Sequence, residues 1–155
     1  PLNINIGMWI LLVDGADAPL NIFVKAISKN PQIPYYQFFE DKEATIMVSR
    51  PLKLYHGYTY TFRRTDDGTN IDGSSNNVLH PFYISNTTPQ QTYAISLDGS
   101  GSQTDGIIGN QSFKLTFTQS FSSNNKLYWY CTFHSQQMTG EFIINDNVGV
   151  QSYSS

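Results

Sequence analysis

The chain contains 155 residues with a mass of 17.5 kDa, which suits one domain with a single hydrophobic core. Hydrophobic residues make up 39% and aromatic residues 14%, so a folded chain is expected and a disordered one is not. Charged residues are only 14%, the net charge is −3, and the one adjacent basic pair is Arg63-Arg64. No basic stripe is present to follow a phosphate backbone, so a nucleic-acid partner is not expected.

The polar surface is mostly uncharged. Ser, Thr, Asn and Gln supply 52 residues, which is typical of secreted or surface-exposed β proteins. This composition favours an extracellular, periplasmic or virion-surface location. The most apolar run, residues 4–13, has the sequence INIGMWILLV and is far shorter than the roughly 20 residues that a membrane-spanning helix needs. It predicts a buried strand, and no membrane span is expected.

Short stretches of alternating apolar and polar residues recur along the chain, and no long helical period appears. They predict an all-β fold, which we interpret as an antiparallel Greek-key β-sandwich. Turn compositions separate several strands, and the polar segment 85–111 is expected to be partly irregular. In chain order the predicted strands are 3–13, 21–26, 35–39, 44–48, two strands around Gly57 within 52–62, 78–84, 113–118, 127–131 and 140–145.

Three regions are predicted along the chain. Residues 50–147 form the main sandwich domain. Residues 1–49 supply extra N-terminal strands that pack on the sandwich or extend it, and residues 148–155 form a polar tail.

One short segment carries most of the chemistry. Cys131, His134 and Met138 place a thiol, an imidazole and a thioether on one loop after the strand LYWYC. These are soft or borderline metal ligands, which copper prefers. A type 1 copper site also needs a second imidazole, and His80 at the entry to another strand is the natural candidate. The single cysteine excludes an internal disulfide and any zinc module with paired cysteines.

The segment from about Arg50 to Asn145 resembles the cupredoxin family, the blue copper proteins that include plastocyanin, amicyanin and pseudoazurin. The resemblance lies in a strand pair around a glycine (LKLYHGYTYTF), a loop that ends in His80, an alternating strand (SFKLTFT) and the motif YWYCTFHSQQMTGEF. It covers about two-thirds of the chain. One departure is Pro81, where family members often carry a polar residue that tethers the strand with the cysteine.

The resemblance implies a cupredoxin-like sandwich with one mononuclear type 1 copper ion, which transfers single electrons and catalyses nothing. By position it implies His80, Cys131 and His134 as equatorial ligands and Met138 as a weak axial ligand that tunes the potential. A redox partner protein is implied as well. Phe133, between two of these ligands, is our candidate for the apolar patch at which that partner docks.

A second hypothesis treats the chain as a structural module. The motifs HPFYIS and LYWYC, followed by HS and Met-x-Gly, resemble cupredoxin-like modules in structural proteins of marine phages and large DNA viruses. The chain would then belong to a virion, fibre or cell-surface assembly, with its metal site structural or empty. Residues 1–49 would serve self-association with neighbouring subunits.

Other interpretations of the same residue types are less favoured. Multicopper oxidases need histidines on both sides of the cysteine, whereas Tyr130 and Thr132 flank Cys131 here. His56 beside a glycine is expected to be an exposed turn residue. The acidic loop 65–73 lacks the glycine position and the closing glutamate of a calcium-binding EF-hand, so we expect a solvated turn.

Overall fold

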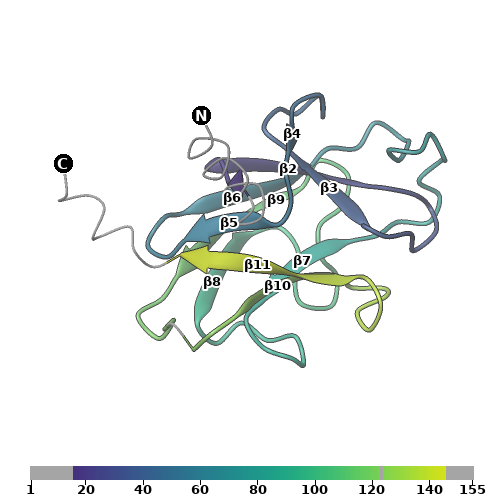
Figure 1. Ribbon diagram of the computed structural model, residues 1–155. Coiled ribbons are helices and arrows are strands. Elements are labelled where there is room, and N and C mark those ends of the chain that lie inside the picture. The colour runs from purple at the N-terminus through teal and green to yellow at the C-terminus, as the bar shows by residue number, and fades with distance from the viewer. Residues whose placement is uncertain (1–15, 123, 146–155) are drawn as a thin grey trace, which may run out of the picture.

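The computed structural model describes residues 16–122 and 124–145, and within these ranges the fold is all-β without a helix (Figure 1). It follows that these ranges contain no helix able to cross a membrane. The described strands are β1 (Ala16–Asp17), β2 (Asn21–Ala26), β3 (Tyr36–Phe39), β4 (Met47–Val48), β5 (Leu52–Tyr55), β6 (Tyr60–Arg64), β7 (Phe82–Ser85), β8 (Ile95–Gly99), β9 (Ser112–Phe117), β10 (Leu127–Cys131) and β11 (Thr139–Asn145).

The strands form two sheets with one core between them, so the predicted β-sandwich is confirmed. One sheet has the order β1-β5-β11-β10-β7, and the other has the order β4-β3-β2-β6-β9-β8. The prediction of an antiparallel sandwich holds for most pairs but is wrong for three, because β1 and β11 both pair with β5 in parallel, and β2 pairs with β6 in parallel. The sheets are therefore mixed, and the Greek-key arrangement stays a prediction.

The parallel pairs follow from the way the chain crosses between sheets. The strands predicted on either side of Gly57 both form, as β5 and β6, but they lie in different sheets. Gly57 has a φ of 106°, a conformation that favours glycine and allows the sharp change of direction. Since β5 and β6 cannot pair with each other, each pairs with strands that are distant in the sequence.

Aromatic rings from both sheets form much of the core. Tyr36 and Phe38 on β3 contact Phe82 on β7 and Trp129 on β10, with ring centroids 5.1 to 6.2 Å apart and interplanar angles of 67° to 88°. Edge-to-face contacts of this kind stabilise a fold by about 0.5–1.5 kcal/mol per pair beyond the burial of the rings. The rings of β3 thus belong to the same core as strands that come much later in the chain.

Two short strands differ from the predicted elements. Residues 95–99, inside the segment expected to be irregular, form β8 and pair with β9. Ala16–Asp17, in a predicted turn, form β1 beside β5. The predicted strand 3–13 and the tail 148–155 lie outside the described residues.

The predicted strand 44–48 is reduced to the two residues of β4. The Asp41 carboxylate accepts hydrogen bonds from the backbone N–H groups of Thr45 and Ile46, at 2.9 and 2.8 Å. These bonds hold the preceding turn closed as far as residue 46. Strand pairing with β3 therefore begins only at Met47.

Strands on the two sides of residue 50 pair directly with each other. β1 pairs with β5, and β2 pairs with β6. The division of the chain after residue 49 stays a prediction, but the sheets are built from both segments.

Gly140 on β11 lies directly opposite Trp129 on the neighbouring strand β10, so a larger residue at this position should destabilise the fold. A Cβ atom on Gly140 would overlap Cζ2 and Cε2 of the indole ring. That ring is packed against Tyr36 and Phe38 and cannot move without disturbing them. We expect Gly140→Ala to lower the free energy of unfolding by about 1–3 kcal/mol, the usual cost of an overpacked site, as measured by urea denaturation.

A double-mutant cycle with Trp129→Phe separates this clash from other effects of the alanine. The smaller ring leaves room for a methyl group, so Gly140→Ala should cost less in the Trp129→Phe background than in the parent. Equal costs in the two backgrounds would contradict the proposed overlap.

Candidate metal centre

The backbone of His80 is held from the opposite sheet. Its carbonyl oxygen accepts a hydrogen bond from Nη1 of Arg64 on β6 at 2.6 Å and another from the Tyr36 hydroxyl on β3 at 2.9 Å. All three residues are buried. His80 itself lies two residues before β7, so these bonds tie the start of one sheet to the face of the other.

The imidazole of His80 is oriented by the backbone of Lys29. Nε2 of His80 lies 3.0 Å from the Lys29 carbonyl oxygen, and because a carbonyl only accepts, Nε2 is the protonated nitrogen. Nδ1 of the neutral ring then presents its lone pair to the other side, where Cys131 lies. Burial lowers the pKa of His80, which favours this neutral, ligand-competent ring.

The Cys131 thiol completes a group of three candidate ligands. Cys131 ends β10 and is fully buried. Its Sγ lies 3.8 Å from Nδ1 of His80 and 3.6 Å from Nδ1 of His134, and the ligand atoms all lie within 4.8 Å of one another. In residues 16–122 and 124–145 this is the one group of three or more His, Cys, Asp or Glu side chains placed to hold a metal ion.

The environment of Cys131 both opposes and supports its ionisation. Burial raises the pKa of the thiol. Hydrogen bonds from the backbone at Phe133 and His134 act in the opposite direction, as does the positive charge of Arg64. The thiolate that a metal ion requires therefore has donors and a cation already in place around it.

The loop formed by residues 131–138, here called the ligand loop because it carries the candidate ligands, is closed by its own backbone. The N–H of Cys131 donates to the Met138 carbonyl at 2.9 Å, and the N–H of Met138 donates to the His134 carbonyl at 2.7 Å. A third bond runs from the His134 N–H to the Cys131 carbonyl at 3.2 Å. These bonds explain the spacing in the sequence, because two and three intervening residues are what this compact loop accommodates.

Pro81 is the position at which the sequence departs from the family pattern. There a backbone hydrogen bond links the two segments that carry the candidate ligands. The N–H of Thr132 donates to the Pro81 carbonyl oxygen at 3.0 Å, and Cys131 pairs with Phe82 in the adjoining ladder. Proline has no N–H, but its carbonyl is available. The strand that carries Cys131 is therefore tethered through the backbone instead of through a polar side chain at position 81.

The donor separations fit a bound metal ion. Bonds of about 2.3 Å to sulfur and about 2.05 Å to nitrogen, as zinc forms, put S and N about 3.6 Å apart at a tetrahedral angle and about 3.8 Å apart at a trigonal one. The two Sγ to Nδ1 separations, 3.6 and 3.8 Å, match these values. Each imidazole thus already lies at a ligand-like distance from the sulfur, and binding of one ion by both rings would place their two nitrogens within about 4 Å of each other.

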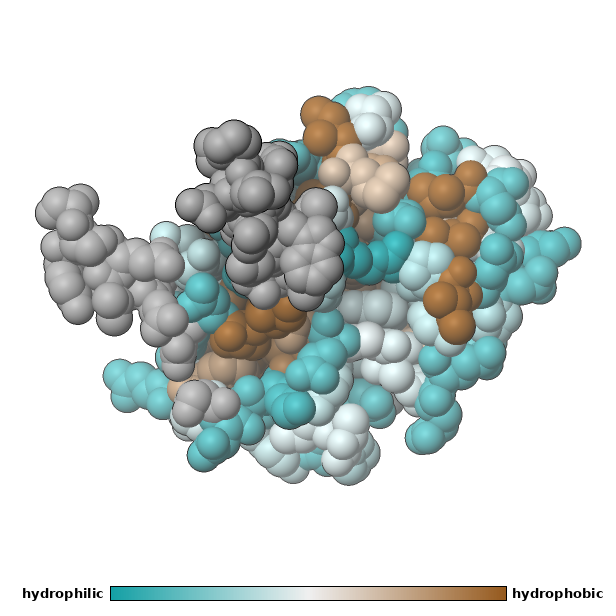
Figure 2. All heavy atoms as spheres, viewed as in Figure 1, coloured by the Kyte–Doolittle hydropathy of each residue, from teal (hydrophilic) through white to brown (hydrophobic). Residues whose placement is uncertain are grey.

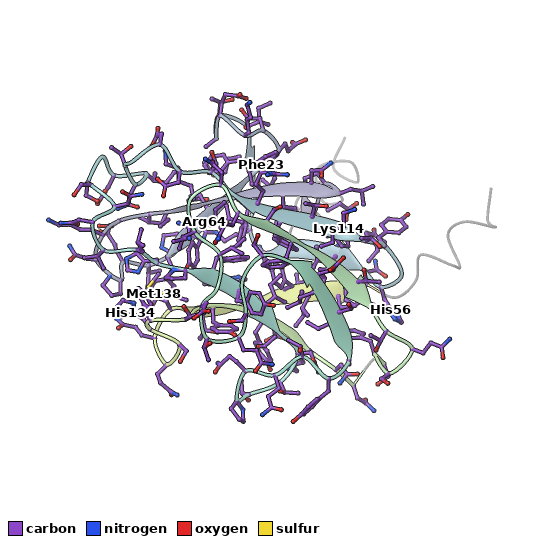
Figure 3. All side chains as sticks on the ribbon, turned by 180° about the vertical axis from the view of Figure 1, so that it is seen from behind. Phe23, His56, Arg64, Lys114, His134 and Met138 are labelled. Atoms are coloured by element: carbon purple, nitrogen blue, oxygen red, sulfur yellow. The ribbon has the colours of Figure 1, made fainter. Side chains whose placement is uncertain are left out.

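Met138 and Phe133 occupy contrasting positions on this loop. Met138 is fully buried, and its backbone is bonded to Cys131 and His134, while Phe133 is 61% exposed. Figure 3 shows Met138 next to His134 at one end of the molecule. Axial ligation by Met138 and partner docking at Phe133 both stay predictions.

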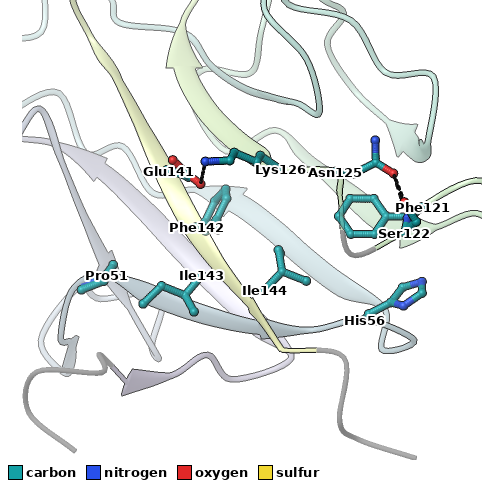
Figure 4. Close-up of a pocket in the computed structure, with 10 residues that line it drawn as sticks. All are labelled: Pro51, His56, Phe121, Ser122, Asn125, Lys126, Glu141, Phe142, Ile143 and Ile144. Carbon is teal, nitrogen blue, oxygen red and sulfur yellow. Dashed lines mark hydrogen bonds and ion pairs between the residues drawn. The ribbon is translucent and has the colours of Figure 1, made fainter. Parts of the chain in front are cut away.

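His56 lies away from this group. Figure 3 places it at the opposite end of the molecule from His134. There it lines a surface hollow together with Phe121 and the apolar residues of β11 (Figure 4), and its ring contacts Phe117 and Phe121 with centroids 5.4 and 5.3 Å away. An ion pair between Lys126 and Glu141 borders the same hollow.

The acidic loop makes internal turns. The carboxylates of Asp66, Asp67 and Asp72 each accept a hydrogen bond from the backbone N–H two residues further along the chain. Asp67 also forms an ion pair with Lys25 at 3.3 Å. This geometry agrees with the interpretation of the loop as a solvated turn.

Sequence reasoning missed the residues that position His80. Arg64 stands in the sequence as half of a basic pair, yet it continues the alternation of Tyr60 and Phe62 on β6, and all three are buried. That alternation is a signal in the sequence for a buried arginine. Tyr36 and the Lys29 carbonyl had no such signal, because their contacts with His80 span 44 and 51 residues.

Comparison of the chain with protein-family models, with curated proteins and with solved structures gives no match.

Proposed function

We propose that this chain is a copper-binding, cupredoxin-like protein with one type 1 mononuclear site that transfers single electrons. His80, Cys131 and His134 would hold the ion through two Nδ1 atoms and one Sγ, with Met138 as the weak axial ligand. The observation that carries the proposal is the buried thiol with an imidazole nitrogen 3.8 and 3.6 Å away on two sides. Two imidazoles, one thiolate and a thioether are the donor set of blue copper sites.

A bound copper ion would supply a one-electron couple between Cu(I) and Cu(II). The chain's part is to keep the ligands in one geometry, so that little rearrangement accompanies the change of charge. The Lys29 carbonyl fixes the ring of His80, and the loop bonds between Cys131, His134 and Met138 fix the rest. Burial of Cys131 excludes water from the sulfur.

The surface above the site offers a route for a partner protein. His134 is only partly buried, and the adjacent Phe133 is 61% exposed. An exposed aromatic ring beside a ligand can pack against another protein while the imidazole edge provides a short path for the electron. This supports docking of a redox partner at Phe133, and the uncharged polar surface supports an extracellular, periplasmic or virion-surface setting.

Copper titration tests the proposal. Adding Cu(II) to the purified chain should produce an intense blue band from the thiolate-copper bond and raise the melting temperature, because the ion binds the folded state only. Cys131→Ser should abolish the band and the rise in melting temperature. His56→Gln, a histidine change outside the site, is the matched control and should keep both.

Two outcomes would contradict the proposed site. One is a colourless protein whose melting temperature does not respond to Cu(II). The other is a copper signal that survives Cys131→Ser or disappears in His56→Gln.

Met138→Leu tests the axial ligand. Leucine keeps the volume and apolar character of the side chain, so the fold should persist, but it removes the thioether. A weak donor favours Cu(II), so its loss should raise the ratio of Cu(I) to Cu(II) affinity by about tenfold, equivalent to about 59 mV in a one-electron potential. The potential is measured by redox titration, with the exposed Met47→Leu as control, and an unchanged value would argue against axial ligation by Met138.

A structural role in an assembly is the second candidate function, and one observation favours it. Ile46 and Met47 are 54% and 59% exposed at β4, the edge of the six-stranded sheet, where apolar surface gathers at the top of Figure 2. Exposed apolar edge strands are sites at which further chains add to a sheet.

Light scattering in solution tests this alternative. An assembly subunit should have a mass above that of one chain, and Met47→Lys should return it to a monomer, because a charged side chain blocks pairing at the edge. The exposed Ile33→Lys serves as control for an added charge elsewhere. A parent protein that is monomeric at all concentrations would contradict a structural role in an assembly.

A further inference from the structure

Arg64 places a positive charge inside the protein. Its side chain is only 4% exposed, and a guanidinium stays protonated in proteins. Nη1 donates to the carbonyl oxygens of His80 at 2.6 Å and Ile107 at 3.0 Å, while Nε is buried without a hydrogen-bond partner. A buried charge destabilises a fold unless an opposite charge compensates for it, so a compensating group is expected nearby.

No ion pair joins Arg64 to a carboxylate in the described part of the chain. Its two ion pairs join other residues, and the Asp66 carboxylate, two residues from Arg64, accepts hydrogen bonds from the loop that follows it. The groups whose negative charge would attract Arg64 are Tyr36, Asp66 and Cys131. Tyr36 offers the face of its neutral ring, with the guanidinium carbon 5.8 Å from the centroid.

Asp66 is only partly buried, whereas Cys131 is as buried as Arg64. A cysteine binds metal as the thiolate, so a metal ion at the site brings a negative charge to Cys131. Arg64 and this thiolate would then neutralise each other within the same core. The arginine stands in place before the ion binds, because its bonds to His80 and Ile107 use backbone oxygens alone.

We propose that Arg64 is the fixed counter-charge of the Cys131 thiolate and that it biases the site toward metal ions of lower charge. This inference rests on the proposed metal site. Arg64, the thiolate and two neutral imidazoles sum to zero, so a monovalent ion leaves one buried positive charge and a divalent ion leaves two. Repulsion from Arg64 is stronger for the divalent ion, which favours Cu(I) over Cu(II). Arg64 is a positioning residue, since it contacts His80 and not the metal.

The test compares affinities for monovalent and divalent ions by competition with chelators of known affinity. Cu(I) and Ag(I) are the monovalent probes, and Cu(II) and Co(II) are the divalent ones. Arg64→Gln keeps a side-chain N–H donor and removes the charge, and Arg64→Lys keeps the charge. The exposed Arg63→Gln makes the same change of net charge on the same strand and is the matched control.

Arg64→Gln should lower the ratio of monovalent to divalent affinity by roughly tenfold or more, because a buried unit charge is only weakly screened by solvent. Arg64→Lys should restore most of the parent ratio. Arg63→Gln should change the ratio by less than about threefold, because exposed charges are screened. If the glutamine variant does not fold, Arg64→Met, which leaves no unpaired polar group, replaces it.

Three results would overturn the inference. If Arg64→Gln and Arg63→Gln give the same ratio of monovalent to divalent affinity, the charge of Arg64 has no special effect, and the proposed copper site is unaffected. Equal losses of monovalent and divalent affinity assign Arg64 a purely structural role. A parent protein that binds none of the four ions overturns both this inference and the proposed function.

Discussion

The carbonyl oxygen of His80 is the point on which the candidate site depends. It accepts hydrogen bonds from Tyr36 on β3 and Arg64 on β6, both in the six-stranded sheet, while the chain after it enters β7 of the other sheet. A carbonyl has two lone pairs, and both are engaged here. Both hydrogen bonds come from the opposite sheet, so one candidate ligand is held by the sandwich itself and not by its loop. The orientation of its ring follows from that fixed backbone and the Lys29 carbonyl.

The other candidate ligands depend on the register of β10 and β11. Trp129 pairs with Gly140 on these strands, and only a residue without a side chain fits beneath the indole ring. A shift of one residue would turn Cys131 to the opposite face of the sheet. The Trp129 packing therefore keeps the thiol directed into the core. It also keeps the Cys131 N–H bonded to the Met138 carbonyl, which closes the ligand loop.

Much of this arrangement could be predicted because it is local in the sequence. The period-2 alternation identified most strands, and the spacing of Cys131, His134 and Met138 within one loop indicated a common site. His80 was identified by chemical need, since the donor set lacked a second imidazole. The mixed sheets could not be predicted, because strand pairing between distant segments leaves no local pattern. The same holds for Tyr36, whose contact with His80 spans 44 residues.

Residues before position 50 are part of the candidate site, even though the family resemblance begins only at about Arg50. The Lys29 carbonyl orients His80, and Tyr36 bonds its backbone and contacts Trp129 beneath the ligand loop. β2 and β3 also have neighbours on both sides within the six-stranded sheet, so in the described residues neither offers an edge to another chain. These strands therefore act within the molecule, because they hold His80, the first candidate ligand, in place. An assembly role for this segment falls to its short edge strands, β1 and β4.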